Sequence, residues 1–441
     1  MKRVESIDAL RGITIFMMIL CASIGYNSGL PAWMFHCQVP PPDYAFHPEV
    51  RGITWVDMVF PIFIFTLGAA IPFWLGRKIE KGELMASIRL QIVRRFVVLL
   101  CFSLTLGHSA ALGGTSCPPV LCGAVQFALW LCLFAALVRI GRWWVNLAGW
   151  IAIAAIFAWM HFAYGLKFAY AQNDCIIMLL AWVALMGGFV WLYTRNNFRW
   201  RAAVILAVVA AKYFGVDFVQ YLVIALPATM VGDILRGSDA VGAVAREDAS
   251  RKPARFAIAA FVALAAAFLQ LWGLFSRYVF ADLCFTYALF VAFILLSYRS
   301  LVKPGHCGTA SQTGLMGFVL LFIGIGFDYI DGGIAKDFCN LSYLFTTCGM
   351  SALVLYFLLW VESRTSLSRF LVLSGQNPMI AYTIGWSVIC PVLVISGFQG
   401  WFDALCSGFH PWLGLLRGLI VTVLTLGATC IFTRFKIFWK S

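Results

Sequence analysis

The chain has 441 residues, of which 62% are hydrophobic and only 12% are charged. Soluble domains carry about a quarter charged residues, so this composition excludes an ordinary soluble protein. The net charge of +13 alone would suit a nucleic-acid-binding protein. However, the apolar residues form successive runs of about 17 to 23, the length that crosses a bilayer as a helix. We therefore predict an all-α, polytopic integral membrane protein.

Fourteen candidate spans follow one another along the chain, and eleven to fourteen transmembrane helices are expected. They lie at 13–29, 55–75, 96–113, 120–138, 144–164, 174–194, 202–214, 218–235, 256–275, 280–297, 315–330, 341–360, 377–396 and 412–433. The first run lacks a small-residue cleavage site and leads into further spans, which indicates an anchor rather than a removable signal peptide. The pair 202–214 and 218–235, and the run 315–330, are candidates for re-entrant or broken segments.

The basic residues predict the orientation of these spans. With the amino terminus inside and strict alternation, 26 of the 32 Lys and Arg residues fall on the cytoplasmic side, whereas the acidic residues show no such bias. Asymmetry of Lys and Arg alone is what the positive-inside rule describes. The positive charge is therefore a topology signal, and no nucleic-acid partner is expected. We predict a bacterial inner (plasma) membrane, since no luminal targeting domain is evident, with both termini cytoplasmic and in contact with membrane lipids.

One domain is expected over residues 1–441. The longest polar interruption, RGSDAVGAVAREDASRKPAR at 236–255, reads as a cytoplasmic linker between two membrane halves. No CxxC pair occurs, so a metal site is not expected. The sequence leaves a homodimer open.

The outer loop at 30–54 is the part of the chain richest in reactive side chains. It holds two histidines, His36 and His47, and two acids, Asp43 and Glu49. Histidine suits proton transfer near neutral pH, and long loops often carry function. For an unselected histidine, an unremarkable position near the membrane interface is the commoner interpretation.

Three further groups of polar residues lie near the ends of spans. Thr54 and Asp57 have the S/T-x-x-D spacing of a helix amino-terminal cap, and the carboxylate would also serve to orient a histidine or hold a polar substrate. Asp8 and Arg11 have the spacing of an ion pair on a helix surface, next to the first span. Lys212 is the most deeply placed ionisable residue, and Asp217 is its predicted partner.

A resemblance connects these groups. SIDALRG at 6–12 precedes an apolar span, and a second motif comprises His47, Gly52, Thr54, Asp57, Val59, Phe60 and Pro61. Together they resemble the heparan-alpha-glucosaminide N-acetyltransferase family of transmembrane acyltransferases. Weaker matches follow in order, at Gln126 and in the segments LPATMVGDILRG, GGIAKDFCNLSYLFTTCG and LSGQNPMIAY, which include Lys336 and Asn377. The resemblance thus extends over most of the chain.

The resemblance implies a transmembrane acyltransferase fold and a transfer reaction. Acetyl-CoA would donate an acyl group from the cytoplasm, with no metal, to an amino sugar or glycan on the outer face. His47 would act as general base or carry the acetyl group, and Asp57 would orient it. The polar residues Asp8, Arg11, Thr54, Lys212, Lys336 and Asn377 are the candidates for binding substrate. Cations suit the phosphates of coenzyme A, and Arg77, Lys78, Arg94 and Arg95 are the candidates there, with Lys81 in the same cluster.

The chain departs from the family pattern in the outer loop and at the end of the first span. Val50 stands where the family usually has tryptophan, and Ala22 stands where it has asparagine. The longer loop, with AWMFHCQVPPP, resembles a bacterial subgroup of DUF5009-type proteins. In such a loop His36 rather than His47 would face the substrate, and the choice stays open. A transporter for a sugar-like or lipid-linked solute is the alternative function, since broken spans and intramembrane charges are typical of transporters.

Overall fold

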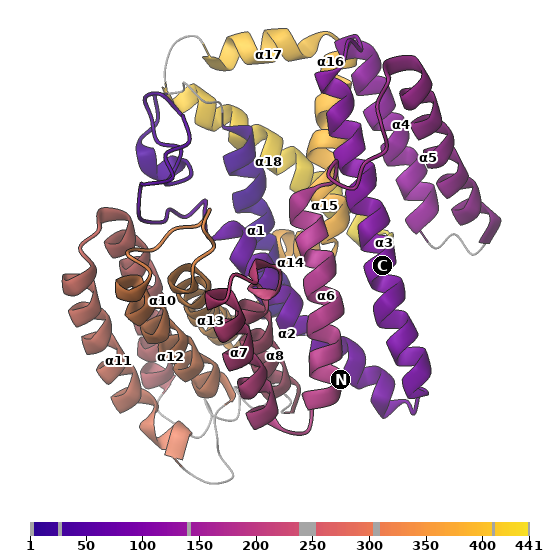
Figure 1. Cartoon of the computed structure of the whole chain (residues 1–441). Coiled ribbons are helices and arrows are strands. Elements are labelled where there is room, and N and C mark those ends of the chain that lie inside the picture. Colours follow the sequence, from indigo (N-terminus) through magenta and orange to yellow (C-terminus); the bar gives the residue numbers. More distant parts are fainter. Residues whose placement is uncertain are drawn as a thin grey trace. The chain divides into compact units, whose positions relative to one another are not determined.

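The computed structural model describes residues 4–24, 29–138, 143–237, 253–302, 309–407 and 411–439, and it is helical throughout (Figure 1). The helices are α1 (Glu5–Ser23), α2 (Val59–Glu80), α3 (Met85–Ala111), α4 (Pro119–Leu137), α5 (Trp143–Tyr164), α6 (Cys175–Thr194), α7 (Phe198–Tyr213), α8 (Leu222–Gly237), α10 (Pro253–Ser276), α11 (Val279–Val302), α12 (Thr309–Ile330), α13 (Leu341–Arg364), α14 (Arg369–Gln376), α15 (Pro378–Ile384), α16 (Cys390–Ile395), α17 (Phe398–Ser407) and α18 (Pro411–Arg434). No sheet occurs in these ranges.

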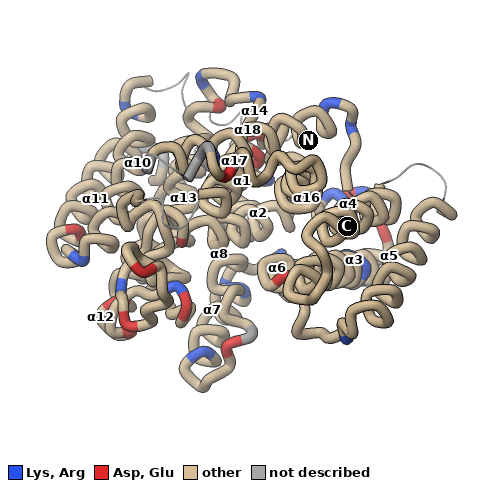
Figure 2. Tube along the Cα trace, turned by 90° about the horizontal axis from the view of Figure 1, so that it is seen from above, with Lys and Arg blue, Asp and Glu red and all other residues tan. Residues whose placement is uncertain are grey.

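Twelve of the described segments are long and apolar enough to cross a membrane. This number lies within the predicted eleven to fourteen, and it confirms the all-α polytopic fold. Figure 2 shows how little charge lies along the helices, since most of the trace is neither acidic nor basic. The predicted spans 202–214 and 218–235 correspond to α7 and α8, which have only 16 residues each and are not among the twelve. The run 315–330, in contrast, belongs to a full-length candidate at Ala310–Ile330.

Contacts divide the chain into two compact units, each made of three segments. The first comprises Met1–Thr14, Pro31–Arg89 and Met186–Val372, and the second comprises Ile15–Leu30, Leu90–Leu185 and Leu373–Ser441. The predicted linker at 236–255 falls between α8, which ends at Gly237, and α10, which begins at Pro253. Its residues 238–252 lie outside the described part of the chain.

Glycine allows the central helices of the first unit to approach each other closely. A Cβ atom added at Gly68 of α2 would lie 2.5 Å from the carbonyl oxygen of Ala225 in α8, and one added at Gly232 of α8 would lie 2.4 Å from that of Ala69. Small residues at such contacts let the backbones of membrane helices pack directly. Most residues of α8 are consequently buried although the helix is short.

Helix α1 begins with a cap that another helix supplies. The carboxylate of Glu362, near the end of α13, accepts hydrogen bonds from the backbone N–H groups of Glu5 at 3.1 Å and Ser6 at 2.8 Å, and from the Ser6 hydroxyl. The first N–H groups of a helix have no partner within the helix, and a negative charge there complements the helix dipole. Glu362 therefore ties the start of α1 to α13.

In the second unit, buried apolar side chains of α3, α4, α5 and α15 pack into one core that also includes Trp439. The indole of Trp130 in this core donates a hydrogen bond to Thr383 at 2.9 Å. The segment after α15 is interrupted, since Gly385–Ile389 forms a π-helical turn before α16. Such turns replace the regular hydrogen-bond pattern of a helix and often lie near functional sites.

Candidate functional site

Asp57 lies just before α2 and is the centre of a polar cluster in the first unit. Its carboxylate is 1% exposed. Oδ2 accepts hydrogen bonds from the backbone N–H of Cys37 at 3.1 Å and that of Thr54 at 2.9 Å. The Thr54 hydroxyl donates to the carbonyl oxygen of Phe35 at 2.7 Å, which joins the two ends of the outer loop. The predicted Thr54–Asp57 spacing thus forms a capped turn that precedes α2, while α2 itself begins at Val59 rather than 55.

The other carboxylate oxygen of Asp57 contacts two side chains. Oδ1 lies 2.7 Å from Nδ1 of His36 and 3.8 Å from Nζ of Lys336. Burial would raise the pKa of Asp57, but the His36 hydrogen bond and the Lys336 charge outweigh burial and lower it. Asp57 is therefore ionised at neutral pH. The side chains of His36 and Lys336 are 34% and 27% exposed, so both are accessible from outside the protein.

His47 lies in the same loop in a different environment. Its Nε2 contacts Asp43 at 2.9 Å and its Nδ1 contacts Glu49 at 3.1 Å, and both acids are exposed. The hydrogen bond with Asp43 raises the pKa of His47. Asp57 therefore pairs with His36 and not with His47. The catalytic role of either histidine stays a prediction, but His36 has a buried carboxylate partner, which orients a histidine that acts as a general base.

The loop between α12 and α13 carries Lys336 and is fixed by several polar contacts. Asp328 forms a two-point ion pair with Arg277 at 3.0 and 3.1 Å, and its Oδ1 also accepts a hydrogen bond from the Ile334 N–H at 2.6 Å. Lys212 donates to the carbonyl oxygen of Phe338 at 3.3 Å. Lys212 also pairs with Asp217, as the sequence predicts. The cations near this loop thus hold the segment that presents Lys336.

Cys37 adjoins the cluster but is not suited to act as a nucleophile. Burial raises the pKa of its thiol to about 12, and the charge of Asp57 adds to this effect. The reactive form of cysteine is the thiolate, so Cys37 is inert at neutral pH. Histidine is therefore the side chain of this cluster that is suited to proton transfer.

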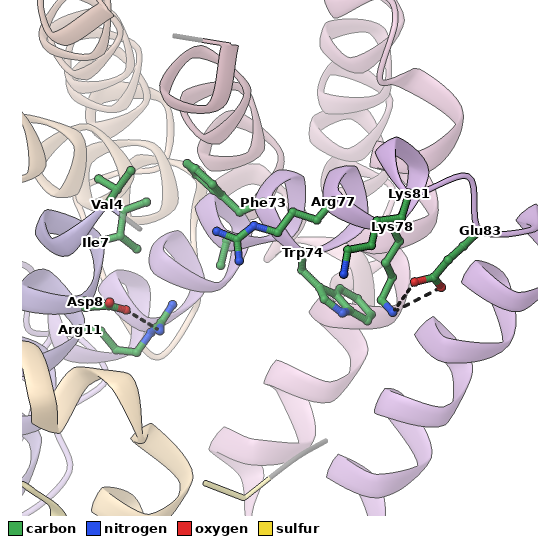
Figure 3. Close-up of a pocket in the computed structure, with 11 residues that line it drawn as sticks. Val4, Ile7, Asp8, Arg11, Phe73, Trp74, Arg77, Lys78, Lys81 and Glu83 are labelled. Carbon is green, nitrogen blue, oxygen red and sulfur yellow. Dashed lines mark hydrogen bonds and ion pairs between the residues drawn. The ribbon is translucent and has the colours of Figure 1, made fainter. Parts of the chain in front are cut away.

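A basic cavity of about 470 Å³ lies between α1 and the second half of α2 (Figure 3). Its walls carry four cations and two carboxylates: Arg11, Arg77, Lys78, Lys81, Asp8 and Glu83. Lys78 pairs with Glu83 at 3.4 Å and Asp8 pairs with Arg11 at 3.7 Å, whereas Arg77 and Lys81 make no ion pair with any described residue. The aromatic rings of Phe73 and Trp74 complete the lining. The volume is within the range of small-molecule sites.

The structure thus separates the predicted site residues into distinct groups. Thr54 and Lys336 join His36 and Asp57, whereas Asp8 and Arg11 line the basic cavity with Arg77 and Lys78.

Arg94 and Arg95 lie on α3 and do not line this cavity. Asn377 belongs to the second unit, where its side chain donates a hydrogen bond to the carbonyl oxygen of Ile437 at 2.8 Å. The described residues include no group of three or more His, Cys, Asp or Glu that could hold a metal ion.

Sequence reasoning missed two contributors to these sites. The hydroxyl of Tyr343 on α13 donates to the backbone carbonyl of Asp57 at 2.8 Å, 286 residues away in the chain. Trp74 lines the cavity, but in the sequence it is one aromatic residue in an apolar span. Neither carries a local signal, because each acts through a contact that only the tertiary fold creates.

The fold and these sites define a polytopic α-helical membrane protein with a histidine–aspartate–lysine cluster before one helix and a basic cavity at the other end of that helix. Residues 3–217, just under half of the chain, match the family described as Domain of unknown function (DUF5009). A stretch of 104 residues is 26% identical to Heparan-alpha-glucosaminide N-acetyltransferase from Homo sapiens. The match covers 24% of this chain and 14% of that protein, so the chain spans about a seventh of its relative's length. The family resemblance predicted from the motifs is confirmed.

Proposed function

We propose that the protein is a membrane-bound acyltransferase, which moves an acetyl or similar acyl group from coenzyme A to an amino sugar or glycan. The observation that carries this proposal is the placement of two unlike sites at the two ends of α2. Asp57 immediately precedes the helix, and Arg77, Lys78 and Lys81 lie at its end. The 22 residues of α2 rise by about 33 Å at ~1.5 Å each, which matches the ~30 Å hydrocarbon core of a bilayer.

The basic cavity is the proposed donor site. Coenzyme A carries three phosphates, and four cations around a confined space supply the charge-assisted hydrogen bonds that phosphates require. Trp74 and Phe73 offer faces on which an adenine ring can stack. By the positive-inside rule this end of α2 is cytoplasmic, where coenzyme A is made. The human relative is by name an acetyltransferase, which favours the same donor.

The cluster around Asp57 is the proposed acceptor site. When Nδ1 of His36 donates to Asp57, Nε2 is left with the lone pair that accepts a proton from the acceptor amine. In the transfer the acyl C–S bond breaks as a C–N bond forms. One amine proton passes to Nε2 of His36, and the imidazolium then gives up that proton as the departing thiolate takes one up, so that the products are the amide, the free thiol and a neutral His36. Asp57 stabilises the imidazolium that forms, as a buried carboxylate does beside a catalytic histidine.

Binding and transfer are tested separately. Isothermal titration calorimetry of the detergent-purified protein should show acetyl-CoA binding that weakens in Arg77→Gln and Lys81→Gln. Arg94→Gln removes the same charge outside the cavity and is the matched control.

In a transfer assay against a panel of amino sugars, we expect His36→Ala to be inactive and His47→Ala to retain activity. Loss of activity only in His47→Ala would show that the general base is the exposed His47 and not His36. Absence of acetyl-CoA binding by the wild type would reject the proposal.

A transporter is the second candidate function, and one observation favours it. The π-helical turn at Gly385–Ile389 interrupts the span from Pro378 to Ile395, and interrupted helices form the substrate sites of many transporters. Uptake of labelled sugars into proteoliposomes without acyl-CoA distinguishes the two candidates, since the acyltransferase requires the donor.

A further inference from the structure

Two side chains compete for a single nitrogen of His36. Nδ1 lies 2.7 Å from Oδ1 of Asp57 and 3.0 Å from Nζ of Lys336. An ionised carboxylate only accepts hydrogen bonds, and an ammonium group only donates them. In a neutral imidazole Nδ1 is either a donor or an acceptor. It therefore satisfies Asp57 or Lys336, but never both at once.

The two arrangements give His36 opposite chemistry. If Nδ1 carries the hydrogen and donates to Asp57, Nε2 has the lone pair and is a base. If Lys336 donates to Nδ1, the hydrogen of the neutral ring moves to Nε2, which then cannot accept a proton. Among the described residues Nε2 has no hydrogen-bond partner, so no third group fixes the choice.

Both competitors are held in place by their own surroundings. Asp57 is fixed by the N–H groups of Cys37 and Thr54. The turn that carries Lys336 is closed by the Cys339 N–H, which donates to the Lys336 carbonyl at 2.8 Å. The Asp337 N–H donates to the side chain of Gln38 at 3.3 Å, which ties this turn to the loop that holds His36. The competition is therefore between a fixed carboxylate and a lysine whose backbone is fixed next to the His36 loop.

We propose that Lys336 is a positioning residue that competes with Asp57 for Nδ1 and thereby keeps part of the His36 population in the tautomer that is not a base, and that an acceptor that binds Lys336 removes this competition. The catalytic consequence of this inference rests on the proposed function, in which His36 is the general base. An acceptor whose hydroxyl or carboxylate oxygen takes the Lys336 ammonium leaves Nδ1 to Asp57, and Nε2 then gains its lone pair. The share of His36 that is competent as a base thus rises when an acceptor is bound.

Carbethoxylation by diethyl pyrocarbonate measures the lone pair without any acyl transfer. The reagent attacks an unprotonated imidazole nitrogen, and mass spectrometry of the digested protein reports His36 and His47 separately. The rate is followed from pH 5.5 to 8.5 in the absence of substrate. The variants are compared at the plateau of the rate, because only a neutral imidazole has two tautomers.

We expect the plateau rate at His36 to rise in Lys336→Met by roughly fivefold, the shift in population that one hydrogen bond typically produces. Lys336→Arg keeps a group that only donates, and it should stay at the wild-type rate. Lys212→Met is the matched control, because Lys212 contacts the same loop through Phe338 and not His36. The His47 rate should be the same in all variants and controls for the reagent, while thermal unfolding checks that each variant is folded. Lys336→Ala is a second neutral variant should the methionine variant fail this check.

Equal plateau rates in the wild type and both neutral variants would overturn the inference. An equal rise in Lys212→Met would also overturn it, because the effect would then come from the loop or from the lost charge. The outcome is independent of the donor. If Lys336→Met raises the rate and the protein binds no acetyl-CoA, the control of the tautomer stands and the acyltransferase proposal falls.

Discussion

At the scale of single residues, Asp57 shows how a buried charge is made stable. Its carboxylate is surrounded by two backbone N–H groups, a histidine and a lysine, which together replace the water that burial removes. These partners offset part of the cost of burying the charge, and removal of the charge would leave them unsatisfied.

We predict that Asp57→Asn lowers the free energy of unfolding by about 3 kcal/mol at neutral pH, the usual cost of breaking a buried ion pair. The pKa of Asp57 is lowered in the fold from its usual 3.8. Its stabilising contribution is therefore complete above that value and is lost as the pH falls through the lowered pKa. Thermal unfolding monitored by tryptophan fluorescence should show a difference between variant and wild type that shrinks in strong acid.

Asp43→Asn is the control for this prediction. Asp43 also pairs with a histidine of the same loop, but its side chain is 52% exposed. Exposed pairs contribute little to stability, so its melting temperature should match that of the wild type. If Asp57→Asn and Asp43→Asn lowered the melting temperature equally, the loss would come from a general change in the loop and not from the buried carboxylate.

The sequence predicts the members of the outer site but not their pairing. Both histidines, Asp57, Thr54 and Lys336 were identified from residue type, spacing and the family resemblance. The choice of His36 as the partner of Asp57 depends on an irregular loop, in which the Thr54 hydroxyl is bonded to the Phe35 carbonyl and thereby places residue 36 against residue 57. Irregular loops have no periodicity from which such a contact can be inferred.

At the scale of elements, the contact between α2 and α8 depends on two glycines that face backbone. We predict that Gly68→Val destabilises the protein by about 2 kcal/mol or more, because the added atoms meet the Ala225 carbonyl and the backbones must separate. Gly326→Val is the matched control, since Gly326 is also helical and has nothing within 4 Å of an added Cβ. Thermal stability of the purified variants in detergent checks both. Similar losses of stability in the two variants would mean that the added side chain destabilises either helix, and that the contact with α8 is not the cause.

The apolar runs of the sequence predict that a helix exists more reliably than they predict the residue at which it begins. Helix α3 starts at Met85, although its apolar run starts near residue 96, because Arg89, Arg94 and Arg95 extend the helix beyond the predicted membrane region. Composition marks the part of a helix that lies in lipid and not the part that continues into water. The π-helical turn at 385–389 was likewise beyond prediction, since its sequence, GWSVI, is ordinary for a span.

At the scale of the whole molecule, the two ends of α2 should be accessible from opposite sides of the membrane. We predict that Asp43→Cys reacts with a membrane-impermeant maleimide from outside, and that Glu83→Cys reacts only in inside-out vesicles. Both positions are tested after the exposed native residues Cys175 and Cys284 are replaced by serine. Labelling of both positions from the same side would contradict the predicted topology and, with it, the division of donor and acceptor between the two ends.

A second prediction at this scale concerns how the proposed donor site recognises the phosphates of coenzyme A. Acetyl-pantetheine carries the same thioester as acetyl-CoA but lacks the phosphates, and we expect it to bind at least about tenfold more weakly, because charge-assisted hydrogen bonds to the cavity cations are lost. Raised salt should weaken acetyl-CoA binding and leave acetyl-pantetheine binding unchanged. Competition with labelled acetyl-CoA measures both. Equal affinities would show that the cations of the cavity do not recognise phosphate.

The cap on α1 has a consequence for biosynthesis. Ser6 is made first and its partner Glu362 is 356 residues later, so at ~5–20 residues per second the ribosome needs about 20 to 70 s to produce the second half of the contact. Throughout that interval the first turn of α1 lacks the Glu362 carboxylate as its partner. The final docking of α1 is therefore a late step, which follows insertion of α2 to α13. A chain that stops before residue 362 would expose this helix end to the proteases that remove unassembled membrane proteins.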